Sequence, residues 1–315
     1  ENPQHYKQIA EKINNSPDIK LISIQHEFGI FGGKLGSHIT HFLEKVEKPV
    51  IITFHSILPN PSEARKKIVK EIAAKVSAII VMANTAVDIL NKDYNIEKSK
   101  IHMVHHGIPN VSFYKNKYFK KKLNLNNRKV LSTFGLLSRG KGIEYMIKSL
   151  PALVEKNPDI LYLVIGETHP VIRKNEGEKY RNELIQLVNE LGLQNNVKFY
   201  NKYLTLQEII NYLLATDIYV CTNLDRNQIT SGTLAYALGC GRAIVSTPSI
   251  YAEELLSNEK GILAEFKNPE SFTRAIDKIL SDEQLKENLE KRAYSFSRQM
   301  TWPNVASRYL NTFNK

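Results

Sequence analysis

The chain has 315 residues, which at roughly 150 residues per domain predicts two domains. Its 42% hydrophobic and 24% charged residues are typical of a soluble globular protein, and without an apolar run of about 18 residues no membrane-spanning helix is expected. The formal net charge of +11 favours anionic partners, but no recognition motif accompanies it, so nucleic acid is not expected as a partner.

Strand and helix patterns alternate through the first hundred residues. Short apolar runs predict strands at 21–25, 50–54, 78–82 and 101–104. Helical spacing of apolar residues predicts a helix over 39–46. A second helix is expected to take Asn60 as its N-cap and Pro61 as its first residue. This order of elements predicts a parallel sheet flanked by helices.

The stretch 112–128 breaks this rhythm, and we interpret it as an interdomain linker. Lysines are concentrated here, and aromatic side chains alternate with them between Phe113 and Lys122, with Lys115 among the lysines. A basic and aromatic surface of this kind suits an anionic membrane or a phosphorylated acceptor. A solvated linker explains the same charge, and both interpretations stay open.

A second alternating series begins at residue 129. Strands are expected at 129–134, 161–165, 197–200, 218–221 and 243–245, with helices between them. Further amphipathic helices fill 270–298. The last segment, 303–313, places four apolar side chains on one face of a helix, namely Val305, Tyr309, Leu310 and Phe313.

The segment from Gln228 to Pro248 is the most informative part of the chain. A polar turn leads into a short helix of small residues that ends at Gly239 and Gly241, and an apolar strand follows. Free backbone amides at the start of this helix can bind a phosphate group. These amides belong to Thr230, Ser231, Gly232 and Thr233. An ordinary loop, helix and strand of an α/β domain fits the same pattern.

The chain shows no pattern typical of a metal site. Cys221 and Cys240 lie among apolar or small residues and are expected to be reduced core residues. No histidine or acidic cluster has the spacing of zinc or calcium ligands. The N-terminus has no signal-peptide pattern, so we expect a cytoplasmic protein, with peripheral membrane attachment as an open alternative.

Several motifs together resemble the retaining group 1 glycosyltransferases, family 4, of the GT-B fold. The run from Phe134 to Gly142 resembles that family's glycine and lysine element, and the Gln228 to Pro248 segment resembles its nucleotide-sugar region. Residues 25–33 and 53–55 look like parts of its acceptor-side domain. The resemblance implies an α/β fold of two doubly wound, Rossmann-like domains facing across a cleft.

The domain limits follow from this resemblance. A shortened acceptor-side domain is expected at 1–111, completed by 303–315 crossing back to it. The linker is expected at 112–128, and the nucleotide-sugar-binding domain at 129–302. The family normally begins with further strands and a glycine-rich loop before Leu21, and the chain lacks an initiator Met, so we expect a fragment.

The resemblance also implies which residues form the site. Lys141 and Arg139 are expected to face the diphosphate, and His55 the sugar or the acceptor. The residues expected to bind the donor are Gly135, Gln228, Thr230, Ser231, Gly232, Thr233 and Tyr236. Glu167 and His169 are added to them because they directly follow the expected strand 161–165, although an ordinary turn explains these two residues as well. Those expected on the acceptor side are His26, Glu27, Gly32 and Gly33.

Three positions depart from the family's pattern. Gln228 and Tyr236 stand where the family has two glutamates. Leu136 stands where it has an arginine, and Arg139 is expected to supply the missing charge. A glutamine can still hydrogen-bond a sugar, whereas a tyrosine offers no carboxylate to the ribose.

The expected activity is metal-independent transfer of a hexose from a nucleotide-diphosphate sugar to a saccharide or lipid-linked acceptor, without a separate cofactor. A retaining reaction needs no strong enzymic base when the leaving phosphate takes the acceptor proton, so the lack of a catalytic triad is no objection. Two alternatives stay open: a sugar-nucleotide epimerase of the same fold, and a non-catalytic subunit that binds the nucleotide sugar.

Overall fold

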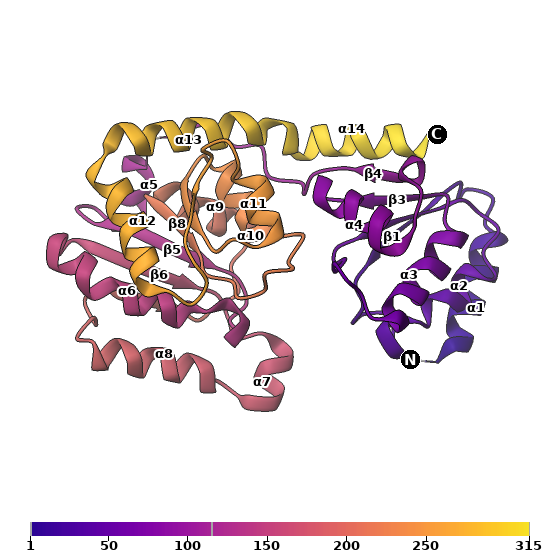
Figure 1. Cartoon of the computed structure of the whole chain (residues 1–315), viewed down its shortest axis with the longest axis horizontal. Coiled ribbons are helices and arrows are strands. Elements are labelled where there is room, and N and C mark those ends of the chain that lie inside the picture. Colours follow the sequence, from indigo (N-terminus) through magenta and orange to yellow (C-terminus); the bar gives the residue numbers. More distant parts are fainter. Residues whose placement is uncertain (1, 115, 315) are drawn as a thin grey trace. The chain divides into compact units, whose positions relative to one another are not determined.

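The computed structural model describes residues 2–114 and 116–314, so Lys115 of the basic stretch lies outside the described residues. The chain divides into two compact units (Figure 1). The first unit runs to His106 and also takes in Asn227–Thr230 and the chain from Pro303 onward. The second unit consists of Gly107–Arg226 and Ser231–Trp302.

Parallel strands form the centre of the first unit. Over the described residues the sheet has the order β1-β2-β3-β4. Its strands are β1 (Ile22–His26), β2 (Val50–Phe54), β3 (Ala78–Val81) and β4 (Ile101–Met103). Its helices are α1 (Pro3–Asn14), α2 (Ile39–Leu43), α3 (Glu63–Lys75) and α4 (Asn84–Tyr94). Strands β2 and β3 are buried along their whole length, which explains their unbroken apolar sequences.

Helix α3 begins later than its sequence signals predict. Ser62, rather than Asn60, is the N-cap, and its hydroxyl accepts the backbone N–H of Arg65 at 3.4 Å. Asn60 has a φ of 48°, in the left-handed region that asparagine tolerates. The chain therefore turns at Asn60 and Pro61 before the helix starts.

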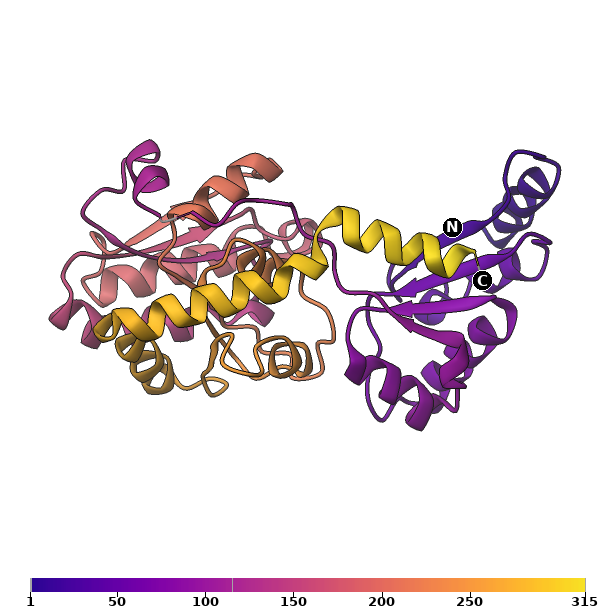
Figure 2. The same ribbon diagram turned by 90° about the horizontal axis from the view of Figure 1, so that it is seen from above.

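Helix α14 (Trp302–Phe313) packs against the sheet of the first unit. Val305 is buried with Ile51, Ala78, Ile80 and Val104, and the rings of Tyr309 and Phe313 pack against the same cluster. Figure 2 shows α14 alongside these strands. Leu310 was expected on the same face, but it is 58% exposed because it lies one residue, or about 100° of helix, beyond Tyr309.

The second unit contains a larger parallel sheet, ordered β10-β9-β8-β5-β6-β7 over the described residues. Its strands are β5 (Lys129–Phe134), β6 (Ile160–Ile165), β7 (Val197–Tyr200), β8 (Ile218–Cys221), β9 (Ala243–Ser246) and β10 (Ile262–Leu263). The first of them in sequence, β5, has β6 on one side and β8 on the other, so the strand order reverses between β5 and β8. In sheets of this type, ligands bind outside the carboxyl ends of the strands at such a reversal.

Helices surround this sheet. They are α5 (Lys117–Lys122), α6 (Ile143–Lys156), α7 (Pro170–Glu176), α8 (Lys179–Glu190), α9 (Leu206–Ala215), α10 (Gly232–Gly239), α11 (Ile250–Leu255), α12 (Pro269–Ser281) and α13 (Glu283–Ser297). Side chains of α6, α8, α12 and α13 share one buried core with β5, β6, β8 and β9. Among the described helices, none has both the length and the apolar character needed to cross a bilayer.

Residues 112–128, expected to be a linker, belong to the second unit instead. Their helix α5 packs against α9. The carboxylate of Asp217, at the start of β8, accepts hydrogen bonds from Lys120 Nζ at 2.5 Å and from the side-chain amide of Asn116. It also accepts the backbone N–H of Val130 at 2.7 Å, so one buried charge joins α5 to β5 and β8. The sequence did not predict this pairing, because nothing in the pattern distinguishes Lys120 from the exposed lysines beside it.

Candidate functional site

The loops that follow β5 and β6 meet at two glycines. A Cβ atom on Gly166 would lie only 2.1 Å from the carbonyl oxygen of Gly135, so no side chain fits there. Beyond this contact the N–H of Leu137 donates to the carbonyl of Glu167 at 2.8 Å, and the N–H of His169 donates to the carbonyl of Leu137 at 2.9 Å. Strand-like pairing thus continues past the sheet and fixes both loops.

Lys141 lies where the strand order reverses. Its carbonyl accepts a hydrogen bond from Thr222 Oγ1 at 2.5 Å, just beyond the end of β8. Gly142 has a φ of 59°, and a Cβ atom there would lie 2.6 Å from the carbonyl oxygen of Thr222. The half-buried side chain of Lys141 forms no ion pair with any residue that the structure describes. The loop is therefore held by its backbone, and the ammonium charge is available to a ligand.

The start of α10 lies beside the same loop. A Cβ atom on Gly135 would lie 3.4 Å from the methyl group of Thr233, and the ring of Tyr236 lies 6.4 Å from that of Phe134. Ser231 caps α10 by accepting the N–H of Leu234 at 3.3 Å. Because the first amides of a helix have no carbonyl partner within it, this end of α10 can bind an anion.

Two predicted donor residues stand just ahead of α10 in the chain. Gln228 and Thr230 lie in Asn227–Thr230, which groups with the first unit. The hydroxyl of Thr230 donates to the carbonyl of Ile229 at 2.8 Å. The described contact of α10 with Gly135 comes from Thr233, three residues after Thr230.

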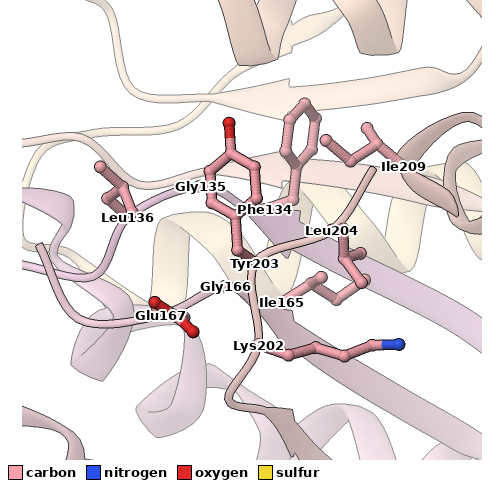
Figure 3. Close-up of a pocket in the computed structure, with 10 residues that line it drawn as sticks. All are labelled: Phe134, Gly135, Leu136, Ile165, Gly166, Glu167, Lys202, Tyr203, Leu204 and Ile209. Atoms are coloured by element: carbon pink, nitrogen blue, oxygen red, sulfur yellow. The ribbon is translucent and has the colours of Figure 1, made fainter. Parts of the chain in front are cut away.

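A hollow of about 120 Å³ opens beside the two glycines (Figure 3). Most of its wall is apolar, while Glu167 and the ammonium group of Lys202 lie at opposite ends of it in this view. A concave apolar surface with a few polar groups at its edge suits a planar ring. The lining residues are Phe134, Gly135, Leu136, Ile165, Gly166, Glu167, Lys202, Tyr203, Leu204 and Ile209.

Sequence reasoning missed the part of this hollow that follows β7. Lys202, Tyr203 and Leu204 come directly after that strand, and Ile209 lies in α9. Their position was the available signal, because the carboxyl ends of β5, β6 and β7 share one edge of the sheet. The ring of Tyr203 is 79% exposed and forms the rim.

Glu167 and His169 have structural partners. The carboxylate of Glu167 pairs with Arg173 at 3.1 Å and still lines the hollow. His169 is instead the N-cap of α7, where its Nδ1 accepts the N–H of Val171 at 3.3 Å. The structure thus keeps Glu167 at the candidate site and gives His169 a capping role.

Arg139, expected to face the diphosphate, is engaged elsewhere. Its guanidinium group donates to both carboxylate oxygens of Glu183 on α8, at 2.6 and 2.8 Å, and lies over the ring of Tyr180. These residues line a separate groove that also includes side chains of α6 and α8. Two parallel hydrogen bonds are the geometry that a guanidinium and a carboxylate favour, so Glu183 holds Arg139 away from the diphosphate. Lys141 is then the better candidate for the cation at the point where the strand order reverses.

His26, expected to face the acceptor, is buried. Its side chain is 0% exposed, and neither ring nitrogen has a hydrogen-bond partner in the described structure. The rings of Phe28, Phe31 and Phe54 surround it at 5.0 to 5.3 Å between centroids. His26 is therefore part of the core, where a charged form is disfavoured, and it directly precedes the loop that contains Gly29, Gly32 and Gly33.

The other predicted residues of the first unit lie around this loop. Glu27 is exposed. Gly32 and Gly33 have φ values of 71° and 68°, in the left-handed region that favours glycine. His55 follows β2, and its Nε2 lies 2.7 Å from Gln25 Oε1. Burial lowers the pKa of His55, and the charge of Glu27 partly opposes that shift.

The buried state of His26 predicts how stability depends on pH. Burial, aided by His55, lowers the pKa of His26 to about 4, whereas an unfolded histidine titrates near 6.5. As pH falls from about 6.5 to 4 the unfolded state binds the proton first, so the unfolding free energy should fall by up to about 3 kcal/mol. Urea unfolding across this range measures the slope.

Two variants control that measurement. Above about pH 5, His26→Leu should remove most of the slope, with His55 supplying the rest, and replacement of the exposed His5 on α1 should leave it unchanged. Below that pH, Glu178, Glu183 and Glu208 add a slope of their own, because their folded pKa values are lowered by hydrogen bonds and ion pairs. A slope in His26→Leu equal to that of the unaltered chain would contradict the assignment.

Comparisons with known proteins identify the family and the fold of this chain. The model of glycosyl transferases group 1 matches residues 115–296. Spore coat protein SA of Bacillus subtilis is 23% identical over 204 residues, which cover 62% of this chain and 51% of that protein. Mannosylfructose-phosphate synthase of Agrobacterium fabrum is 24% identical over 258 residues, covering 78% and 55%. The chain spans about half the length of these relatives.

Solved structures share the fold. HepE of Anabaena, in complex with UDP and glucose, has a TM-score of 0.79 and 17% identity, with 98% of this chain and 80% of that chain covered. Sucrose-phosphate synthase of Thermosynechococcus elongatus also has a TM-score of 0.79 and 17% identity, covering 99% and 77%. These likenesses confirm the predicted α/β fold of GT-B type. Because the family model spans more than half of the sequence, this chain belongs to the group 1 glycosyl transferases.

Proposed function

We propose that this chain binds a nucleotide-diphosphate sugar and transfers its hexose, with retention and without a metal, to a saccharide or lipid-linked acceptor. The observation that carries the proposal is the meeting of Lys141, the Gly135 loop and the start of α10 where the strand order reverses. A cation without an ion-pair partner and a set of helix-start amides together suit a diphosphate. The hollow beside Gly166 suits the base.

Complexes of similar structures support this donor class. HepE of Anabaena was solved with UDP-glucose, and its structure has a TM-score of 0.78 against this chain. TarM of S. aureus was solved with UDP and α-GlcNAc-glycerol. We transfer to this chain the class of donor, and leave the sugar and the base open.

The proposed reaction breaks the bond between C1 of the sugar and the diphosphate oxygen, and forms a bond from C1 to the acceptor oxygen. Negative charge develops on the leaving diphosphate, where Lys141 and the amides of Gly232 and Thr233 would stabilise it. The acceptor hydroxyl loses its proton to the leaving phosphate. His55 is proposed to hydrogen-bond the sugar or the acceptor.

A non-catalytic nucleotide-sugar-binding subunit is the second candidate. Gln228 and Tyr236 in place of two carboxylates favour it, because the ribose then lacks an acidic partner. An epimerase of the same fold would use the donor alone. Both alternatives share the donor site with the first proposal and differ from it in the product.

Cytoplasmic location and contact with an anionic membrane stay predictions. Helix α5 exposes Tyr118 to 68%, together with the side chains of Lys117, Lys121 and Lys122. Such a surface suits anionic lipid headgroups. Lys120 does not contribute to it, because it pairs with the buried Asp217.

Donor binding is the first test. In a thermal-shift screen of UDP-, GDP-, ADP- and TDP-sugars, a cognate donor at 100 times its dissociation constant should stabilise the fold by about 2.7 kcal/mol. Tyr203→Ala, at the rim of the hollow, should reduce the shift, while Tyr118→Ala, which removes another largely exposed tyrosine, on α5, should not. Labelled donor with acceptors then distinguishes transfer, epimerisation and binding alone. No shift with any donor would contradict all three.

The second test compares two cations of one loop. Lys141→Ala should lower kcat by about 100-fold or more, as expected for losing one charge contact to a developing anion, with little change in Tm. Arg139→Ala should lower it only a few-fold, because Arg139 pairs with Glu183. Steady-state kinetics on folded variants decides this, and equal losses from both would contradict the assignment.

Chelation tests the metal-independent mechanism. The described residues hold no group of three or more His, Cys, Asp or Glu that could bind a metal ion. Transfer should therefore keep its rate after dialysis against EDTA. Loss of activity that manganese or magnesium restores would refute this part of the proposal.

A further inference from the structure

Four side chains of the first unit form a continuous chain of hydrogen bonds from α14 to His55. His55 Nε2 lies 2.7 Å from Gln25 Oε1, and Gln25 Nε2 donates to Thr53 Oγ1 at 3.3 Å. Thr53 Oγ1 in turn lies 3.1 Å from the hydroxyl of Tyr309. The last helix is thereby linked to a histidine that lies more than 250 positions earlier in the chain. We call this chain of contacts the relay.

The direction of the relay determines the tautomer of His55. An amide nitrogen can only donate, so Gln25 gives its hydrogen to Thr53 and presents its carbonyl oxygen to the imidazole. That oxygen can only accept, so the neutral ring carries its proton on Nε2. The hydroxyl hydrogen of Thr53 is left to donate to Tyr309. The Nδ1 of His55 then remains as the acceptor of the ring, with no hydrogen-bond partner among the described residues.

Because Thr53 is buried, these hydrogen-bond directions depend on the hydroxyl of Tyr309. Thr53 is 0% exposed, so water cannot replace a lost partner, and a buried hydroxyl without one is costly. Without Tyr309 the Thr53 hydroxyl has one remaining partner, the Gln25 amide. The hydroxyl hydrogen of Thr53 then finds an acceptor only if the Gln25 amide turns its oxygen toward Thr53. The amide nitrogen would then donate to His55 Nε2, so the ring would have to carry its proton on Nδ1.

We propose that Tyr309 is a positioning residue for His55, acting through Thr53 and Gln25 to hold the ring as its Nε2–H tautomer. In this state Nδ1 accepts a hydrogen bond from a hydroxyl of the sugar or the acceptor. The part that concerns activity rests on the proposed function; the tautomer does not. The ring of Tyr309 packs in the core of the first unit and its hydroxyl joins the relay, so the two roles are separable by removing one oxygen.

The decisive measurement is the ¹⁵N NMR spectrum of His55 at about pH 8, where a histidine ring is neutral. The unaltered chain should show the Nε2–H tautomer. Tyr309→Phe keeps the ring and should move His55 toward Nδ1–H, and Thr53→Val, which breaks the middle of the relay, should also lose the preference for Nε2–H. Thr312→Val is the matched control, since it removes from the same helix a hydroxyl whose one hydrogen bond within the described part of the chain is to the carbonyl of Arg308.

Kinetics supplies a second readout. Tyr309→Phe should lower kcat about fivefold, the equivalent of one neutral hydrogen bond, and Thr312→Val should leave it unchanged. An Nδ1–H tautomer in the unaltered chain, or an unaltered Nε2–H tautomer in Tyr309→Phe, would overturn the relay. A chain that shows the expected tautomers but transfers no sugar refutes the proposed function and leaves the relay standing.

Discussion

The backbone contact between Gly135 and Gly166 is the constraint on which the candidate donor site depends. It brings the loops after β5 and β6 closer than any side chain allows, and the pairing of Leu137 with Glu167 and His169 follows from it. On the other side of β5, Gly142 makes the same kind of approach to Thr222. Larger residues at these positions would push the loops apart. The hollow and the position of Lys141 therefore both require glycine where two backbone segments touch.

The strands were predictable from the sequence because most of them are buried. Strands β2, β5, β7 and β8 begin and end where predicted. A parallel strand covered on both faces, such as β2, needs apolar residues throughout, whereas β7 at the edge of its sheet exposes Lys198. Helices α1, α5 and α7 were missed because they bury few side chains. Only Phe119 of α5 and Ala10 of α1 are buried, and no residue of α7 is. A pattern of apolar spacing cannot reveal a helix that packs so little of itself.

The candidate site was predictable only where backbone geometry defines it. Motifs of glycine and small residues identified the Gly135 loop and the start of α10. The partners of charged and aromatic side chains were not predictable: Arg139 pairs with Glu183, and His26 lies among three phenylalanines. Sequence spacing indicates which charges lie near a loop, but residues 44 positions apart, such as Arg139 and Glu183, are brought together only by folding.

The contribution of α14 to the first unit bears on the order in which the chain can fold. The ribosome makes residues 2–106 well before Val305 and Tyr309, which pack on residues of β2 and β3 and on Val104, just after β4. The first unit therefore waits with an uncovered apolar surface, while nearly all of the second unit can fold during synthesis. The first unit is thus completed only after the second unit has been made, and a chain interrupted before α14 would leave that surface open to association with other unfolded chains.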